Sequence, residues 1–93
     1  MSNTMIRLII EGRVQGVWFR DSTRRKAMET GDIYGWVKNR SDGAVETVAE
    51  GPEEKIEQFI AWCHQGPTHA NVTNIEEIKE PWKGEFDSFD IVF

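Results

Sequence analysis

Hydrophobic and polar residues alternate along four stretches of the chain, and an alternation with period two predicts β-strands. The four stretches are residues 6–11, 33–38, 44–50 and 89–93. Gly12 is predicted to end the first strand. Asp42 and Gly43 lie between the second and third strands, and this dipeptide is typical of a tight β-hairpin turn.

Two other segments have the spacing or the boundary residues of helices. The first covers residues 20–30, with Asp21 and Ser22 suited to a helix start and Gly31 suited to its end. The second begins with Pro52 at its first helical position. Its apolar residues recur at the i, i+3, i+4 and i+7 positions of one helix face, namely Ile56, Phe59, Ile60 and Cys63.

Residues 72–80 carry conflicting signals. Val72, Ile75 and Ile78 are three positions apart, which favours a helix, but their β-branched side chains favour a strand, and we interpret the segment as a strand. The predicted order is then β-α-β-β-α-β with a short extra strand at the C-terminal end. This order indicates an α+β fold of the ferredoxin-like split βαβ type, an antiparallel sheet with two helices on one face. Many unrelated functions use this fold, so it does not identify one.

The composition narrows the class of protein. The 93 residues predict a single domain over residues 5–93, and 11 basic against 16 acidic residues give a net charge of −5. An acidic chain is a poor candidate for nucleic-acid binding. No apolar run approaches the roughly 18 residues of a membrane span, no signal peptide is recognisable, and one cysteine cannot form an internal disulfide. We therefore expect a cytoplasmic monomer without a nucleic-acid or membrane partner.

The loop before the first predicted helix carries groups that suit an anion. Gly16 can adopt positive φ, and successive backbone N–H groups in such a loop form an anion-binding nest. Arg20 offers a planar set of donors, and the helix N-terminus adds partial positive charge. A phosphate fits these three features. The alternative is a plain strand–helix connection with Phe19 in the core and Arg20 on the surface, and the physical argument alone leaves both open.

Two motifs resemble those of a known family. Residues 12–20, Gly-Arg-Val-Gln-Gly-Val-Trp-Phe-Arg, resemble the acylphosphatase signature Gly-x-Val-Gln-Gly-Val-x-Phe-Arg, which precedes the first helix. Residues 35–39, Gly-Trp-Val-Lys-Asn, resemble the second motif of that family. The resemblance extends over roughly residues 5–93. One departure lies at residues 30–33, where Thr-Gly-Asp-Ile replaces the usual Leu-Gly-Leu with one inserted residue, and it predicts a weaker helix end.

The resemblance implies an enzyme that hydrolyses acyl phosphates, which are carboxyl-phosphate mixed anhydrides, to a carboxylate and inorganic phosphate. It assigns catalytic roles to Arg20, which would hold the phosphoryl group, and to Asn39, which would position the attacking water. The substrate-binding N–H groups would belong to Gln15, Gly16, Val17, Trp18 and Phe19. The conjugate acid of the leaving carboxylate has a pKa of roughly 4, so no general acid is needed. We expect no cofactor and no metal.

Other reactive residues have simpler interpretations. Cys63 lies on the apolar helix stripe and is predicted to be a buried thiol rather than a nucleophile. His64 and His69 lack further ligands at metal-binding spacing. Trp18 is a candidate lip over the substrate, whereas Trp82 has no predicted place.

Two alternative functions remain at the level of the sequence. One is a non-catalytic module that binds phosphate or an acyl phosphate. The other is an RNA-binding domain of the same fold, which would need aromatic residues beside basic ones on the sheet face, such as Tyr34 and Trp36. The net charge and Asn39 within its motif argue against RNA binding.

Overall fold

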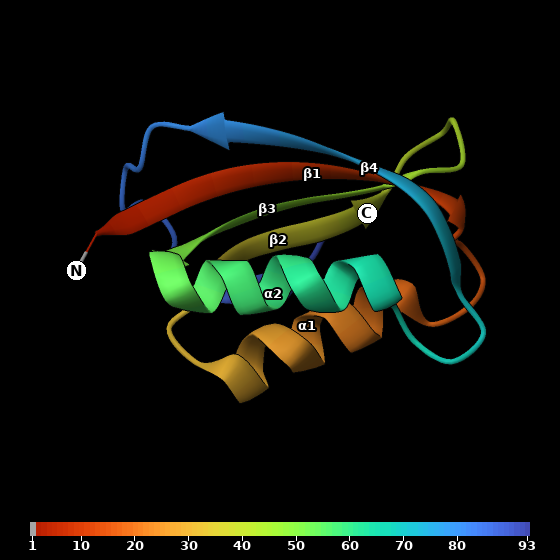
Figure 1. Ribbon diagram of the computed structural model, residues 1–93, viewed down its shortest axis with the longest axis horizontal. Coiled ribbons are helices and arrows are strands. Elements are labelled where there is room, and N and C mark those ends of the chain that lie inside the picture. The colour runs from red at the N-terminus through yellow and green to blue at the C-terminus, as the bar shows by residue number, and fades with distance from the viewer. Residues whose placement is uncertain (1) are drawn as a thin grey trace.

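Seven elements follow one another in the computed structural model of the chain, which describes residues 2–93 (Figure 1). They are β1 (Asn3–Arg13), α1 (Phe19–Thr30), β2 (Tyr34–Asn39), β3 (Val45–Pro52), α2 (Glu53–Gln65), β4 (Asn71–Glu80) and β5 (Phe89–Ile91). The predicted order is confirmed, including the interpretation of residues 72–80 as a strand. No helix among the residues described is long and apolar enough to span a bilayer.

The sheet has the strand order β4-β1-β3-β2-β5, and both helices cover one of its faces (Figure 1). The first four strands pair antiparallel, as the predicted ferredoxin-like plan requires. The extra strand differs, because β5 pairs parallel with β2, with Phe89 opposite Gly35. Residues 81–88 must therefore carry the chain from the β4 edge of the sheet to the β2 edge before β5 begins.

The core lies between the sheet and the two helices. Alternation along β1 directs Leu8 and Ile10 toward the helices, where both side chains are fully buried. Phe19 of α1 and Phe59 of α2 meet them from the other layer. Burial of each such side chain contributes about 1.5–3 kcal/mol, so this layer supplies much of the stability of the fold.

Gly12 does not end the first strand, contrary to the prediction. β1 continues to Arg13 through a shift of register between Glu11 and Gly12 in its pairing with β4. Gly12 has φ 123°, and a Cβ atom there would lie 2.1 Å from the carbonyl oxygen of Asn71. The extra residue of this register shift is Thr73 on β4, and the absence of a side chain at Gly12 leaves room for the β4 backbone to pass close by.

The helix starts also differ from the prediction by a short distance. α1 begins at Phe19, and its N-cap is Trp18, so neither Asp21 nor Ser22 caps it. Asp21 instead lies in the first turn. Pro52 is the N-cap of α2 and the last residue of β3, one position before the predicted place.

The departure at residues 30–33 lies at the C-terminal end of α1, opposite the end that carries Arg20. Gly31, with φ 80°, ends the helix by donating its N–H to the carbonyl of Ala27 at 3.0 Å. Asp32 adopts φ 59°, and its carboxylate forms an ion pair with the ammonium group of Lys55 in α2 at 3.0 Å. Ile33 is buried directly afterwards. The extra residue is thus accommodated by a turn that joins the two helices through a charge pair.

Candidate active site

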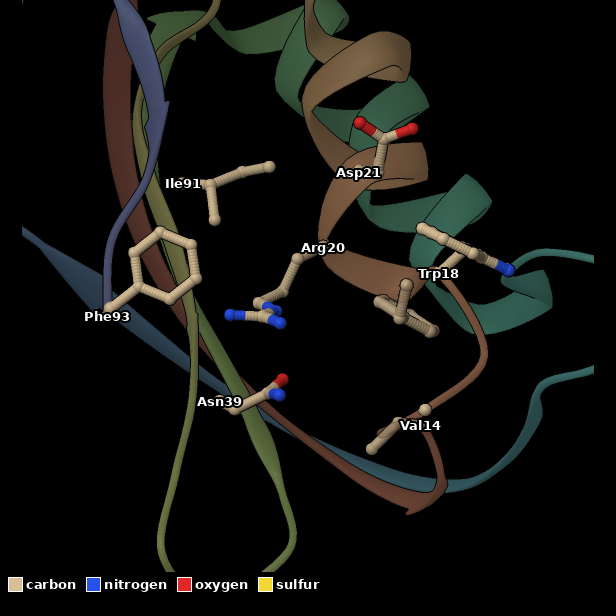
Figure 2. A pocket seen from close by; sticks show the side chains of 9 residues that line it. Val14, Trp18, Arg20, Asp21, Asn39, Ile91 and Phe93 are labelled. Atoms are coloured by element: carbon tan, nitrogen blue, oxygen red, sulfur yellow. The ribbon is translucent and has the colours of Figure 1, made fainter.

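The two motifs meet at one end of the molecule because Asn39, in the second motif, falls on the helix-facing side of β2. Side chains alternate between the two faces of a strand, so Asn39 lies on the same face as Val37, which is buried against the helices. The hydrogen-bonded pairing of β1 and β2 with β3 brings this end of β2 beside the loop that follows β1. Figure 2 shows the Arg20 side chain reaching from the first turn of α1 toward the Asn39 amide.

A cavity of about 410 Å³ lies where these segments meet. Its walls come from the loop after β1, the start of α1, the end of β2 and the segment that contains β5, through Val14, Gly16, Trp18, Phe19, Arg20, Asp21, Asn39, Ile91 and Phe93. The structure thus brings Arg20 and Asn39 to one hollow (Figure 2). Two of the predicted binding residues, Gln15 and Val17, do not line it, and Val17 packs against the core instead.

The start of α1 presents backbone N–H groups that have no partner within residues 2–93. Gly16 has φ 75° and Trp18 has φ 64°, with Val17 between them outside the positive-φ region. Such alternation turns successive N–H groups toward one side, which is the geometry of an anion-binding nest. The first helical N–H with a partner here is that of Ser22, which donates to the Trp18 carbonyl at 3.0 Å. The unpaired N–H groups before it also carry the partial positive charge of the helix N-terminus.

Gln15 acts through its side chain in this structure. Its Nε2 donates to the carbonyl of Arg40 at 2.8 Å and to that of Ala44 at 3.0 Å. These two carbonyls lie on either side of the hairpin turn that follows Asn39. The amide therefore holds the loop after β1 against the turn that positions Asn39.

The hairpin turn has further ties of its own. The backbone N–H of Arg40 donates to the Ala44 carbonyl at 2.8 Å, and the Asp42 carboxylate accepts from the Ala44 N–H at 3.1 Å. The hydrogen bond from Arg40, followed by that from Ala44, lowers the pKa of Asp42. The carboxylate therefore stays charged and bonded at neutral pH, and the turn after Asn39 is well defined.

Arg20 has no carboxylate within ion-pair distance among residues 2–93. The neighbouring Asp21 is paired with Arg25 at 3.1 Å instead. The guanidinium of Arg20 lies 5.0 Å from the centre of the Phe93 ring, as in a cation–π contact. Its donors are therefore available to an anion in the cavity, where they match the oxygens of a phosphoryl group.

Comparison with known proteins agrees with this geometry. The sequence model of the family described as Acylphosphatase matches residues 6–91. This chain belongs to the acylphosphatase family. A curated acylphosphatase from Pelotomaculum thermopropionicum is 43% identical over 93 residues and covers 100% of both chains. Membership of this family shows that the chain is an enzyme that hydrolyses acyl phosphates.

Solved structures give the same fold. The crystal structure of acylphosphatase from Bacillus subtilis superimposes with a TM-score of 0.92 at 38% identity, covering 97% of this chain and 99% of the other. Full-length HypF in a phosphate- and nucleotide-bound form matches with a TM-score of 0.89 at 28% identity, covering 99% of this chain but 12% of that protein. The acylphosphatase fold thus also occurs as a small part of a much larger chain.

Four residues that line the acylphosphatase cavity were missed by the sequence analysis: Val14, Asp21, Ile91 and Phe93. The alternation along residues 89–93 predicts that Ile91 and Phe93 share one face of the last strand, but it does not predict that this face reaches the cavity. The parallel pairing of β5 with β2 brings them there, and no local pattern indicates that pairing. The apolar character of Val14 next to the glycine-rich loop was the only other signal.

The remaining reactive side chains named in the sequence analysis lie outside the cavity. Cys63 is fully buried, and burial raises the pKa of its thiol, so the thiolate needed for nucleophilic attack is disfavoured. His64 contacts Glu77 at 3.3 Å. Within residues 2–93, no three or more His, Cys, Asp or Glu residues are grouped to hold a metal ion.

The sheet face without helices is where an RNA-binding function would lie. Arg7 and Lys38 flank the Trp36 ring there, at 5.8 and 5.4 Å from its centre. Both cations are paired with Glu46, and Arg7 also contacts Glu80 at 3.2 Å. Burial alone would lower the pKa of the Arg7 guanidinium, but its hydrogen bonds to Glu46 and Glu80 outweigh burial, so the pKa is raised overall. These cations are neutralised locally by Glu46 and Glu80.

Proposed function

We propose that acyl phosphates are hydrolysed in the cavity at the start of α1, with Arg20 and Asn39 as its catalytic residues. The observation that carries this assignment is their convergence. An unpaired guanidinium, an amide and a helix N-terminus with unpaired N–H groups line one hollow. A phosphoryl group carries negative charge on several oxygens, and this set of donors complements it without any other cation.

The phosphoryl oxygens would be held by backbone N–H groups of the loop residues that line the cavity, Gly16, Trp18 and Phe19, and by the Arg20 guanidinium. A water molecule attacks phosphorus, and the bond between phosphorus and the acyl oxygen breaks. The carboxylate leaves with the bonding electrons, and inorganic phosphate and a proton are the other products. The transition state of such a transfer is loose, so positioning and charge stabilisation account for most of the rate enhancement.

Asn39 would orient the attacking water. A neutral amide cannot act as a strong base, but its oxygen accepts and its nitrogen donates a hydrogen bond, so it can hold a water in one orientation. The parity of β2 directs the amide toward Arg20, and the Gln15 hydrogen bonds hold the following turn in place. This support favours an enzyme over a module that only binds phosphate, because simple binding does not require a positioned amide.

The proposal includes independence from metals and action as a cytoplasmic monomer. The carboxylate is a good leaving group, so neither a general acid nor a Lewis acid is required. Light scattering during size-exclusion chromatography measures the molar mass and tests whether the protein is a monomer.

Turnover of benzoyl phosphate by the purified protein tests the proposal directly, since loss of the substrate is followed by its ultraviolet absorbance. We expect turnover by the wild type, before and after treatment with EDTA, and by Cys63→Ala. Arg20→Ala should be nearly inactive. A wild type that binds inorganic phosphate but hydrolyses no acyl phosphate would be a binding module. Activity lost on chelation and restored by a divalent ion would contradict the metal-free mechanism.

A further inference from the structure

The cavity is larger than a phosphoryl group requires. A phosphoryl group occupies on the order of 100 Å³, judged from the roughly 30 Å³ that one water molecule takes up in the liquid. The cavity measures about 410 Å³. The remaining space lies beside the anion-binding groups, which is where the acyl part of the substrate must be placed.

Two aromatic side chains stand at the sides of this remaining space. Trp18 is 79% exposed and Phe93 is fully exposed, and both line the cavity. Phe93 stands beside Arg20 on the side of β5, and Trp18 stands at the start of α1 (Figure 2). Neither ring is part of the buried core, so the apolar surface of both is available to a ligand.

The backbone of Trp18 supports a role in binding. Its φ of 64° lies in the left-handed region, which is unfavourable for a bulky residue and which glycine or asparagine adopts more easily. The indole gains little packing in return, because most of it is exposed. This conformation directs a large aromatic ring outward at the edge of the cavity and gives no evident benefit to the fold.

Phe93 forms a wall that is continuous with the anion site. Its ring lies 5.0 Å from the Arg20 guanidinium carbon, and Ile91 from the same segment also lines the cavity. In an acyl phosphate, one bridging oxygen separates the phosphorus from the acyl carbon. A group attached to that carbon therefore lies next to Arg20 when the phosphoryl group is bound, within reach of the Phe93 ring.

We propose that Phe93 and Trp18 form an acyl-group subsite that selects acyl phosphates with flat, apolar acyl groups, aromatic ones above all. The inference rests on the proposed function and adds a substrate class to it. An aromatic acyl group can stack on Phe93 or meet the edge of the indole, since aromatic rings attract one another in these arrangements. A small acyl group such as acetyl reaches neither ring.

Substrate discrimination tests the subsite. The measured quantity is the ratio of kcat/KM for benzoyl phosphate to kcat/KM for acetyl phosphate, and comparing variants removes the difference in intrinsic reactivity. Phe93→Leu, which keeps an apolar side chain without a ring, should lower the ratio about fivefold, and Trp18→Asn, which suits positive φ, about threefold. The double variant should lower it more than tenfold. Trp82→Asn, an exposed tryptophan outside the cavity, should leave the ratio unchanged.

Binding of unreactive analogues to the wild type gives an independent test. Calorimetry should show that phenacylphosphonate, which has CH2 in place of the bridging oxygen of benzoyl phosphate, binds at least fivefold more tightly than acetonylphosphonate, because both carry the same anion and differ only in the group on the acyl carbon. Equal affinities, or a substrate ratio that the Phe93 and Trp18 variants do not change, would overturn the subsite while leaving acyl-phosphate hydrolysis intact. A wild type that hydrolyses neither substrate would overturn the proposed function instead.

Discussion

The two helices begin in similar ways and at opposite ends of the molecule (Figure 1). Neither has a hydrogen bond from a capping side chain, and each begins beside a surface hollow. At α1 the hollow is lined by Arg20 and Asn39. At α2 it is a smaller hollow of about 210 Å³, lined by Ser2, Glu53, Glu54 and Glu57.

The difference shows that a helix N-terminus does not make an anion site by itself. The aligned peptide dipoles place roughly half a positive charge at the start of any helix. At α2 three carboxylates already surround that charge, and the Glu53 N–H donates to the Ser2 carbonyl at 3.0 Å. At α1 the carboxylate of the first turn, Asp21, is paired with Arg25, and Arg20 adds a full positive charge. The side chains of the first turn therefore decide what each end binds.

Removal of the Arg20 guanidinium should have the largest effect, because it takes away the feature that most separates the two helix ends. Arg20→Ala should lower kcat/KM for benzoyl phosphate at least 100-fold, which corresponds to about 2.7 kcal/mol of lost transition-state stabilisation. Arg20→Lys should restore little, because an ammonium group lacks the planar pair of donors. Steady-state kinetics with inorganic phosphate as a competing inhibitor measure both effects.

Lys26→Ala is the matched control for Arg20→Ala. Lys26 is on the same helix, and its loss changes the net charge by the same amount, but it does not line the cavity. Its kcat/KM should stay within twofold of the wild type. A folded Arg20→Ala protein with nearly full activity would show that α1 resembles α2 in having no catalytic anion site.

Asn39 should affect turnover more than binding. Asn39→Ala should lower kcat about 50-fold, or about 2.3 kcal/mol, because the oriented water is needed mainly in the transition state. The inhibition constant of phosphate should change less than threefold. Asn39→Asp should not restore activity, because its carboxylate would repel the bound anion.

Folding must be checked for the Asn39 variants, since this residue leads into the hairpin turn. Circular dichroism and a melting curve will show whether the hairpin is intact. If a well-folded Asn39→Ala protein loses phosphate affinity as severely as turnover, Asn39 is a binding residue and the water-positioning role is wrong.

The sequence predicted those parts of the molecule that depend on local pattern. Alternation identified four of the five strands, and β-branched content identified the fifth, β4. The alternation along residues 33–39 is enough to place Asn39 on the same face of β2 as the buried Val37. Arg20 was identified because its motif and its helix N-terminus are adjacent in the chain. The place of Phe93 was not predictable in this way, because it depends on β5 crossing to the far edge of the sheet and pairing parallel with β2.

Local patterns also left some contacts hidden. Gly12 resembles a strand end, but it is a position inside β1 where the β4 backbone at Asn71 approaches closely, and that neighbour is distant in sequence. The motif marked Gln15 for its backbone N–H, whereas its side chain reaches carbonyls 25 and 29 residues away. Contacts of this kind follow from the packing of separate elements and have no periodic signature.

Loss of the Gln15 amide should have an intermediate effect. Gln15→Ala removes the side-chain donor from the Arg40 and Ala44 carbonyls, each of which keeps one backbone donor, so the free energy of unfolding should fall by about 1 kcal/mol. Because the turn that positions Asn39 is released, kcat should fall about fivefold with little change in KM. Gln58→Ala, at an exposed position of α2, is the control for both measurements. A variant that melts at a lower temperature but keeps its kcat would show that the amide stabilises the hairpin without positioning Asn39.

The smallest expected effect concerns the one carboxylate that lines the α1 cavity. Figure 2 shows the Asp21 carboxylate pointing away from the Arg20 guanidinium, and this exposed group is paired with Arg25 at 3.1 Å. Asp21→Asn should therefore tighten inhibition by phosphate only about twofold, since interactions of exposed charges are worth less than about 1 kcal/mol. The gain should disappear at about 1 M salt, where the screening length is roughly 3 Å.

Glu53→Gln makes the corresponding change at the start of α2. Both substitutions remove a negative charge from a first helical turn, so both should lower the melting temperature slightly. Of the two, Asp21→Asn alone should alter phosphate inhibition, because Glu53 lies at the opposite end of the molecule (Figure 1). Weaker phosphate binding by Asp21→Asn would contradict this expectation. It would mean that the Asp21–Arg25 pair orders the start of α1, and that this ordering favours anion binding more than the negative charge of Asp21 disfavours it.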